Sequence, residues 1–336
     1  MPEPLLRMTE NGFYCKTGQF FIDPWQPVER AVVTHAHADH YTLNCGAYLV
    51  AQPGEALFRA RLGAEARIQT LPYGQKLVQN GVTLSFHPAG HILGSAQVRL
   101  EWGGEVWVVS GDYKVDPDIT CSPFEQLKCD HFITEATFGL PVYRWPPQFE
   151  VYDAINAWWR KNQQAGQASI LYAYALGKAQ RVLSGVDASI GPIYTHGMVE
   201  SLNQAYRQAG VPLPPTRLAT NVDKPSWSQA LIIAPPSAMG TPWLRRFGAQ
   251  SSAFASGWMR IRGMRRRRSI DRGFVLSDHA DWPSLMDVIT ATRAQHIGVT
   301  HGYVHVVARY LQERGLDAQG YSTRFTDEEG EAPERE

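Results

Sequence analysis

Short apolar runs separated by turn signals fill residues 1–140 of the chain. Several of these runs carry β-branched or aromatic residues at alternating positions, which is typical of half-buried strands. One segment between them, 55–62, has the apolar spacing of a helix instead. The pattern predicts a sheet-rich α/β beginning with strands at 30–34, 47–51, 82–86, 97–101 and 106–110.

A proline cluster from Pro141 to Pro147 interrupts this pattern and marks a candidate domain boundary. Beyond it, strand-like and helix-like segments alternate, which favours βαβ units around a small parallel sheet. The residues after Phe325 are polar and acidic, so we expect 326–336 to form a disordered tail. The predicted helices are 151–162, 179–183, 282–294 and 304–314, and the predicted strands are 169–173, 192–194, 273–276 and 297–300.

Composition adds limits on location and partners. With 336 residues, 44% of them hydrophobic, the chain resembles an ordinary globular protein. Lys plus Arg and Asp plus Glu both number 32, so a nucleic-acid partner would need a local basic surface. No secretory signal or membrane-length apolar stretch is evident, and the 4 cysteines form no CxxC pair. We therefore expect a cytoplasmic protein with free thiols.

A run of metal-ligand residue types directly follows the predicted strand at 30–34. His35, His37, Asp39 and His40 lie within six positions and are separated by alanine. Imidazole and carboxylate are ligands that zinc accepts. In an extended segment His35 and His37 point to one side, so they can hold one ion, while Asp39 and His40 reach a second position as the chain turns. This spacing indicates a two-metal site rather than core histidines.

Three further residues at strand ends can complete such a pair. His91 lies in a glycine-flanked loop, Asp112 ends an apolar strand as a natural bridging carboxylate, and His301 ends a late apolar strand before glycine. The other histidines are interpreted as structural or as weaker alternatives: His87, His131, His296 and His305.

The order of these motifs resembles the metallo-β-lactamase superfamily, and in particular its nucleic-acid-processing branch with a β-CASP insertion. The resemblance is carried by HAHADH, AGHILGS, SGD, Glu135 in ITEATFG, His279 in SDHAD and His301 in VTHG. It implies an α/β fold, an αββα sandwich interrupted by a small β-CASP-like α/β domain. The implied domains are 1–143 and 266–325 for the sandwich and 144–265 for the insertion.

The resemblance also implies roles for the candidate residues. One Zn²⁺ would be held by His35, His37 and His91, and the other by Asp39, His40 and His301, with Asp112 bridging both; Mn²⁺ can occupy similar sites. Glu135 and His279 would form a pair near the scissile phosphate.

Such a metal pair is suited to activating water for attack on phosphorus. Asp39 or Asp112 could accept the proton of that water. His279 is the candidate acid for the leaving oxygen, because Glu135 can orient it and favour its charged form. Ser277 and Asp278 are interpreted as caps of the following helix.

Basic residues near the insertion are candidates for contact with the nucleic-acid backbone. Arginines are concentrated before His279, and guanidinium groups suit phosphate oxygens. Two residues are assigned a phosphate contact by resemblance alone, Lys178 and Ser256. The arginine candidates are Arg265, Arg266, Arg267 and Arg268.

Within the family, the chain is most similar to short bacterial members that act as DNA exonucleases beside an ATP-dependent ligase and a helicase. The favoured function is therefore DNA end processing in repair. An RNA-processing nuclease, of the RNase J or messenger-RNA 3′-end type, is the main alternative. A small-molecule metallo-hydrolase and a non-catalytic scaffold are weaker ones, and the first of these fits poorly with Glu135, His279 and the arginine run.

Overall fold

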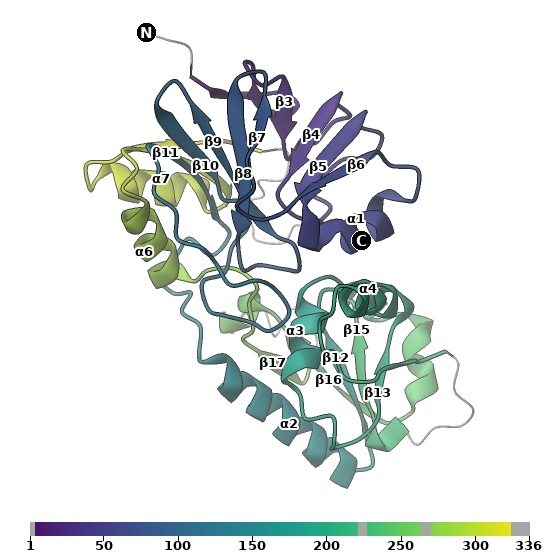
Figure 1. Ribbon diagram of the computed structural model, residues 1–336. Coiled ribbons are helices and arrows are strands. Elements are labelled where there is room, and N and C mark those ends of the chain that lie inside the picture. Colours follow the sequence, from purple (N-terminus) through teal and green to yellow (C-terminus); the bar gives the residue numbers. More distant parts are fainter. Residues whose placement is uncertain (1–3, 221–226, 262, 264–269, 324–336) are drawn as a thin grey trace. The chain divides into compact units, whose positions relative to one another are not determined.

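The computed structural model describes residues 4–220, 227–261, 263 and 270–323, which fall into two compact units (Figure 1). The first unit combines Met1–Tyr143 with His279–Glu336, and the second is Arg144–Asp278. Both contain sheets and helices, so the predicted α/β class is confirmed. The predicted tail at 326–336 lies outside the described residues.

Two sheets form the first unit (Figure 1). One is 6-stranded, in the order β1-β2-β3-β4-β5-β6, and the other is 7-stranded, in the order β19-β18-β11-β10-β9-β8-β7. The strands of the first are β1 (Leu6–Thr9), β2 (Gly12–Cys15), β3 (Phe20–Ile22), β4 (Arg30–Val33), β5 (Ala47–Ala51) and β6 (Ile68–Leu71). Those of the second are β7 (Leu77–Gln79), β8 (Val82–Pro88), β9 (Ala96–Trp102), β10 (Glu105–Val109), β11 (His131–Ala136), β18 (His296–Gly302) and β19 (Asp317–Gly320).

Side chains from both sheets make one apolar core, which includes Ile22 and Val32 from the smaller sheet and Phe86 and Val98 from the larger. The larger sheet builds a second core on its other face, where its strands meet the two C-terminal helices. Burial of apolar side chains on both faces holds these layers together. The helices of this unit are α1 (Glu55–Leu62), α6 (Trp282–Thr292) and α7 (Val304–Gln312).

The second unit is built on a 6-stranded parallel sheet in the order β14-β13-β15-β12-β16-β17. Helix α2 buries Val151, Ile155, Trp158 and Trp159, the i, i+4, i+7 and i+8 spacing of an amphipathic helix. Its strands are β12 (Ala168–Tyr172), β13 (Ile193–Thr195), β14 (Arg217–Leu218), β15 (Leu231–Ala234), β16 (Gln250–Ala255) and β17 (Arg272–Phe274). Its helices are α2 (Gln148–Gln164), α3 (Lys178–Gly185) and α4 (Gly197–Gln208).

The second unit ends later than the 265/266 boundary expected from the sequence. Strand β17 pairs in parallel with β16, so the chain stays in this unit as far as Asp278. The predicted capping of the next helix by Ser277 and Asp278 is also wrong. The N-cap of α6 is Asp281, whose side chain accepts the Ser284 N–H at 3.1 Å.

Strand direction explains where the candidate residues meet. Strand β4 runs parallel to its neighbours, and β10, β11 and β18 run parallel to one another. The carboxyl ends of these four strands lead directly to His35, Asp112, Glu135 and His301. Helices of the described residues include none long and apolar enough to cross a membrane.

Candidate metal centre

The loop after β4 carries three of its four candidate side chains into the interior. His35 and His40 are 1% exposed and His37 is 7% exposed, whereas the Asp39 side chain is 40% exposed. Burying three imidazoles side by side is unfavourable unless their polar atoms find partners. The buried histidines of this loop therefore need polar partners nearby.

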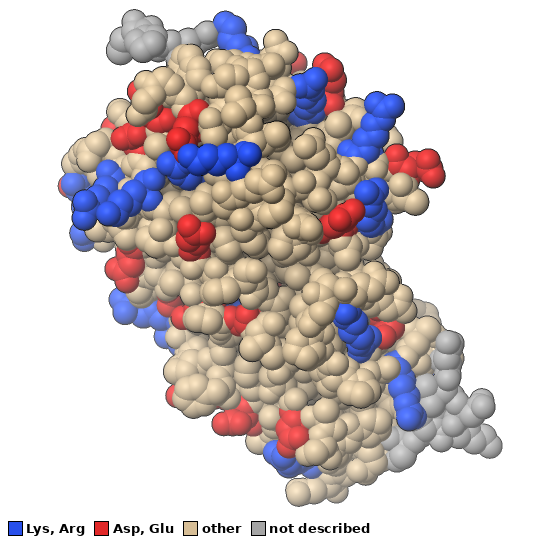
Figure 2. Space-filling view, in the orientation of Figure 1, with Lys and Arg blue, Asp and Glu red and all other residues tan. Residues whose placement is uncertain are grey.

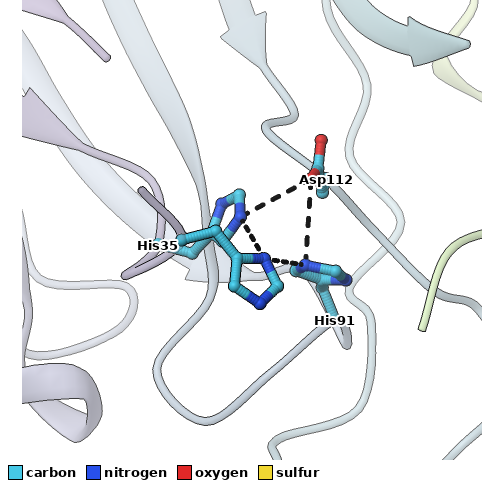
Figure 3. Close-up of side chains that lie close together, drawn as sticks. His35, His91 and Asp112 are labelled. Atoms are coloured by element: carbon cyan, nitrogen blue, oxygen red, sulfur yellow. Dashed lines mark hydrogen bonds and ion pairs between the residues drawn. The ribbon is translucent and has the colours of Figure 1, made fainter. Parts of the chain in front are cut away.

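His35, His37, His91 and Asp112 form the first group, all of them buried. Figure 3 shows the side chains of His35, His91 and Asp112 close together. One ligand atom from each lies within 4.8 Å of those of the others. The His37 Nδ1 atom is 3.1 Å from His35 Nε2 and 3.0 Å from His91 Nε2. Asp112 Oδ2 lies 3.5 Å from His35 Nε2 and 3.8 Å from His91 Nε2. Four ligand-type atoms thus face one small volume.

Asp39, His40 and His301 form a second group with the same 4.8 Å limit. The His40 and His301 rings are stacked with centroids 4.8 Å apart. His40 Nε2 is 3.8 Å from Asp39 Oδ2 and 3.4 Å from Asp112 Oδ2. Asp112 therefore lies against both groups, as a residue shared by two ions must.

A β-bulge directs His301 into this group. Glu135 of β11 pairs with Thr300, but the next residue, Ala136, pairs with Gly302, so His301 is the extra residue on β18. Its φ of 53° is in the left-handed region, which a histidine rarely adopts. Gly302 follows with φ 70°, and a Cβ there would lie 2.4 Å from the Ala136 carbonyl oxygen. The strand end is shaped to re-aim one side chain.

The turn that carries Asp112 depends on a glycine. Gly111 has φ 56°, and a Cβ at this position would lie 2.7 Å from the side chain of Thr34. Any larger residue would push the Asp112 turn away from the loop that starts at His35. The close approach of the two chains is what brings the carboxylate to the histidines.

Asp23, at the end of β3, belongs to the site although the sequence analysis did not include it. Its Oδ2 atom lies 2.8 Å from His40 Nδ1 and accepts the Thr34 hydroxyl at 2.6 Å, and its Oδ1 accepts the Thr34 N–H at 2.8 Å. A carboxylate on the far nitrogen of a histidine fixes the ring and its tautomer for metal binding. The available signal was an aspartate ending an apolar strand in FFIDPW, but nothing local links it to His40, which is 17 residues away.

Two buried polar atoms in the cluster find no hydrogen-bond partner among the described residues: His40 Nε2 and Asp112 Oδ1. Such atoms are costly to bury without a partner. Imidazole and carboxylate are also the donor set preferred by zinc and accepted by manganese. The residues present therefore fit a pair of divalent cations.

The charges in the cluster are strongly coupled. Burial favours neutral His40, but the negative charges of Asp112 and Asp39 and the hydrogen bond that Asp23 accepts outweigh it and raise the pKa of His40 well above its ordinary value. Burial, and then the charge of His40, lower the pKa of His35 well below its ordinary value. Burial would raise the pKa of Asp112, yet His40 and His279 hold it well below its usual range. A positive charge in the cluster is thus favoured by its surroundings.

Glu135 and His279 meet beside Asp112. His279 Nδ1 is 3.0 Å from both carboxylate oxygens of Glu135 and 4.0 Å from Asp112 Oδ2. The Glu135 oxygens also accept the N–H groups of Tyr113 at 2.8 Å and Thr137 at 3.3 Å, so the carboxylate is fixed. The His279 side chain is 19% exposed, whereas Glu135 is buried. The ring is therefore oriented from within and reachable from outside.

The two residues expected to contact phosphate, Lys178 and Ser256, are buried and have partners within the protein. Lys178 and Ser256 are 3% and 1% exposed. The Lys178 ammonium pairs with Asp278 at 2.7 Å, and the Ser256 hydroxyl accepts the Trp258 N–H at 3.3 Å. Their burial gives no support to direct contact with a nucleic acid. Arg265, Arg266, Arg267 and Arg268 lie outside the described residues.

With the site in view, comparison with known proteins finds relatives that carry nuclease and ligase names. No family model matches the chain. A probable DNA ligase from Opitutus terrae is 33% identical over 312 residues, which cover 92% of this chain and 30% of the ligase. Endoribonuclease YSH1 of Yarrowia lipolytica is 30% identical over 123 residues, covering 36% of this chain and 15% of that protein. An RNase J-like protein of Methanocaldococcus jannaschii is 26% identical over 233 residues, covering 59% and 54%.

A solved structure shares the fold. A protein of unknown function from Enterococcus faecalis V583 matches with a TM-score of 0.54 at 11% identity, over 80% of this chain and 74% of that one.

The fold and the site together define an α/β protein with a buried cluster of metal-ligand residues. The YSH1 and RNase J-like matches support the resemblance to the β-CASP branch of the metallo-β-lactamase superfamily. The chain spans under a third of the ligase and of YSH1, at 30% and 15% of their lengths.

Proposed function

We propose that the protein is a two-metal phosphodiesterase that cuts nucleic acid. One cation would be held by His35, His37 and His91, and the other by Asp39, His40 and His301, with Asp112 shared. The observation that carries this proposal is the position of Asp112 Oδ2, within 3.8 Å of histidines in both groups. When bound, the two cations would activate a water and neutralise charge on the phosphoryl group.

The protein's own residues divide the proton transfers between them. Asp112 or Asp39 is placed to accept the proton of the attacking water. His279 would donate a proton to the leaving oxygen from Nε2, because its Nδ1 faces Glu135. A fixed carboxylate behind the ring favours its protonated form and holds its orientation.

DNA is the proposed substrate, attacked at its ends as by an exonuclease that works beside an ATP-dependent ligase and a helicase. The similarity to a probable DNA ligase over 92% of this chain supports this choice. The endoribonuclease and RNase J-like relatives support RNA as the second candidate. Figure 2 shows basic and acidic side chains interspersed on the visible face of the described residues, in line with equal totals of 32, so binding must rest on local contacts.

A direct comparison of substrates tests the proposal. Purified protein supplied with Zn²⁺ or Mn²⁺ is given single-stranded DNA and RNA oligonucleotides of matched sequence, each labelled at one end. We expect faster cleavage of DNA, with products that shorten progressively from an end. Preferential cleavage of RNA would establish the second candidate, and absence of cleavage of both with either metal would refute the phosphodiesterase.

A further inference from the structure

A second buried cluster of charges lies where the chain leaves the second unit. Asp278 Oδ2 is 2.7 Å from Lys178 Nζ, and Asp278 Oδ1 is 2.8 Å from Arg181 Nε. The three side chains are 5% exposed or less. Arg181 also donates to Gln148 Oε1 at 3.2 Å. One carboxylate thus holds two buried cations, one with each oxygen.

The cations come from the start of helix α3, at the carboxyl edge of the parallel sheet. Gly177, with φ 85°, ends the loop after β12, and its N–H is accepted by Gln180 Oε1 at 2.8 Å. Lys178 and Arg181 are one turn apart on α3, so both can reach the same point. A negative charge near a helix N-terminus is favoured as well. The Asp278 carboxylate therefore supplies the negative charge that neutralises Lys178 and Arg181 at this edge of the sheet.

His279 is the next residue, and it is fixed on its other side. Its Nδ1 lies 3.0 Å from both oxygens of Glu135. The following residue, Ala280, donates its N–H to the Tyr113 carbonyl at 2.7 Å. Asp278 and Ala280 therefore anchor the backbone on either side of His279.

Burying charged side chains costs desolvation free energy, even when the charges are paired. Well-packed apolar side chains of similar volume often stabilise a fold as well as buried ion pairs or better, but they fix geometry less strictly. A proton donor, in contrast, needs its ring within a fraction of an ångström of the productive position. An anchor with two directional ion pairs one residue before His279 meets that need.

We propose that Asp278, held by Lys178 and Arg181, is a positioning residue for His279, and this inference rests on the proposed function. The Asp278 side chain does not touch the substrate. It fixes the peptide that carries His279, so that the ring supported by Glu135 can donate its proton to the leaving oxygen when water attacks phosphorus.

The leaving group of the substrate separates positioning from mere stability. A DNA oligonucleotide releases an alkoxide, which needs a proton donor, whereas thymidine 5′-(p-nitrophenyl phosphate) releases nitrophenolate, which does not. The substitution Asp278→Asn keeps size and removes the charge. We expect it to lower kcat on the oligonucleotide by about 10- to 100-fold with little change in KM, as misplacement of a reacting group does. Turnover of the nitrophenyl ester should change less than about threefold, because this substrate bypasses the proton donor.

Companion variants guard against misfolding and general damage. Lys178→Met leaves a balanced Arg181–Asp278 pair, so it should fold and show a smaller loss with the same dependence on leaving group. His279→Ala sets the full size of that dependence, with oligonucleotide affinity retained. Glu200→Gln is the matched control, because Glu200 accepts hydrogen bonds from Arg207 and Thr216 within the same unit, in a network separate from Asp278. It should slow neither substrate selectively.

The outcomes are distinguishable. Selective loss on the oligonucleotide in the Asp278 and Lys178 variants supports the inference. Equal loss on both substrates, or no loss, overturns it while leaving the proposed function in place. If His279→Ala slows both substrates equally, His279 is not the acid and the inference fails with that role. If the wild-type protein turns over neither substrate, the proposed function itself fails.

Discussion

Two buried clusters of charge differ in one respect that separates their roles. In the metal cluster, His40 Nε2 and Asp112 Oδ1 lack hydrogen-bond partners among the described residues. In the Asp278 cluster, each carboxylate oxygen has its own cation at 2.8 Å or less. A buried polar atom without a partner is costly, so the first cluster is complete only with a ligand. In the second cluster both carboxylate oxygens are already paired, so its role is to hold the backbone in place.

The two clusters also differ in the backbone conformations that build them. The metal cluster draws on strand ends and turns that lie far apart in the sequence, and it includes left-handed residues such as His301, with φ 53°, and Asp23, with φ 44°. Strained conformations of this kind persist where surrounding structure enforces them, and they collect at functional sites. The Asp278 cluster needs only one helix turn and one strand exit. The strained backbone therefore lies in the cluster that we propose to bind ions.

Removing the shared carboxylate is the most severe way to break the metal cluster. We expect Asp112→Ala to lower kcat/KM on single-stranded DNA by about 10⁴-fold or more, because metal-ion stabilisation supplies several kcal/mol to such reactions. Bound metal measured by atomic emission should fall in parallel, while the far-ultraviolet circular dichroism stays that of a folded protein. Retained cleavage would show that Asp112 does not bridge the ions.

Many residues of the metal cluster could be predicted because the ends of buried strands can be recognised in the sequence. Apolar runs located β4, β10 and β18, and the chemistry of His35, Asp112 and His301 follows each run directly. Parallel strands bring such ends to one edge, which is why these residues could be singled out as candidates. Their division between two ions came from the resemblance. Helices were equally legible where one face is apolar, and 55–62 agrees with α1 as observed.

What could not be predicted depends on distant partners. Lys178 was assigned a phosphate contact by resemblance alone, yet the carboxylate of Asp278, 100 residues later, pairs with its ammonium group. Asp23 was missed for the same reason. The boundary at 265/266 was implied by the resemblance, whereas pairing of β17 with β16 keeps the chain in the second unit as far as Asp278. The hydrophobic pattern of the sequence predicts local helices and strands. The partner of a side chain depends on the tertiary structure.

Adding metal should stabilise one cluster and leave the other unaffected. A cation that binds only the folded protein adds about 2.7 kcal/mol at 100 times its Kd, which corresponds to a rise in Tm of about 5–10 °C. Differential scanning fluorimetry of the chelated protein with and without Zn²⁺ measures this rise. Asp278→Asn should start from a lower Tm yet show the same rise, and Asp112→Ala should show none. A smaller rise in Asp278→Asn would mean that the two clusters are not separate.

The smallest effect concerns the residue that the sequence did not reveal. Asp23→Asn keeps an oxygen for the Thr34 N–H and tolerates the left-handed backbone, but it removes the charge behind His40. Loss of such a supporting carboxylate weakens metal affinity by about 10- to 100-fold, so activity should fall at limiting Zn²⁺ and return at excess. Asp130→Asn, which alters a carboxylate that accepts the Val106 N–H in the same unit, is the control and should leave the metal titration unchanged. If excess metal fails to restore Asp23→Asn, Asp23 acts in the chemistry rather than in holding His40, and the division between atoms that bind ions and atoms that hold them must be redrawn.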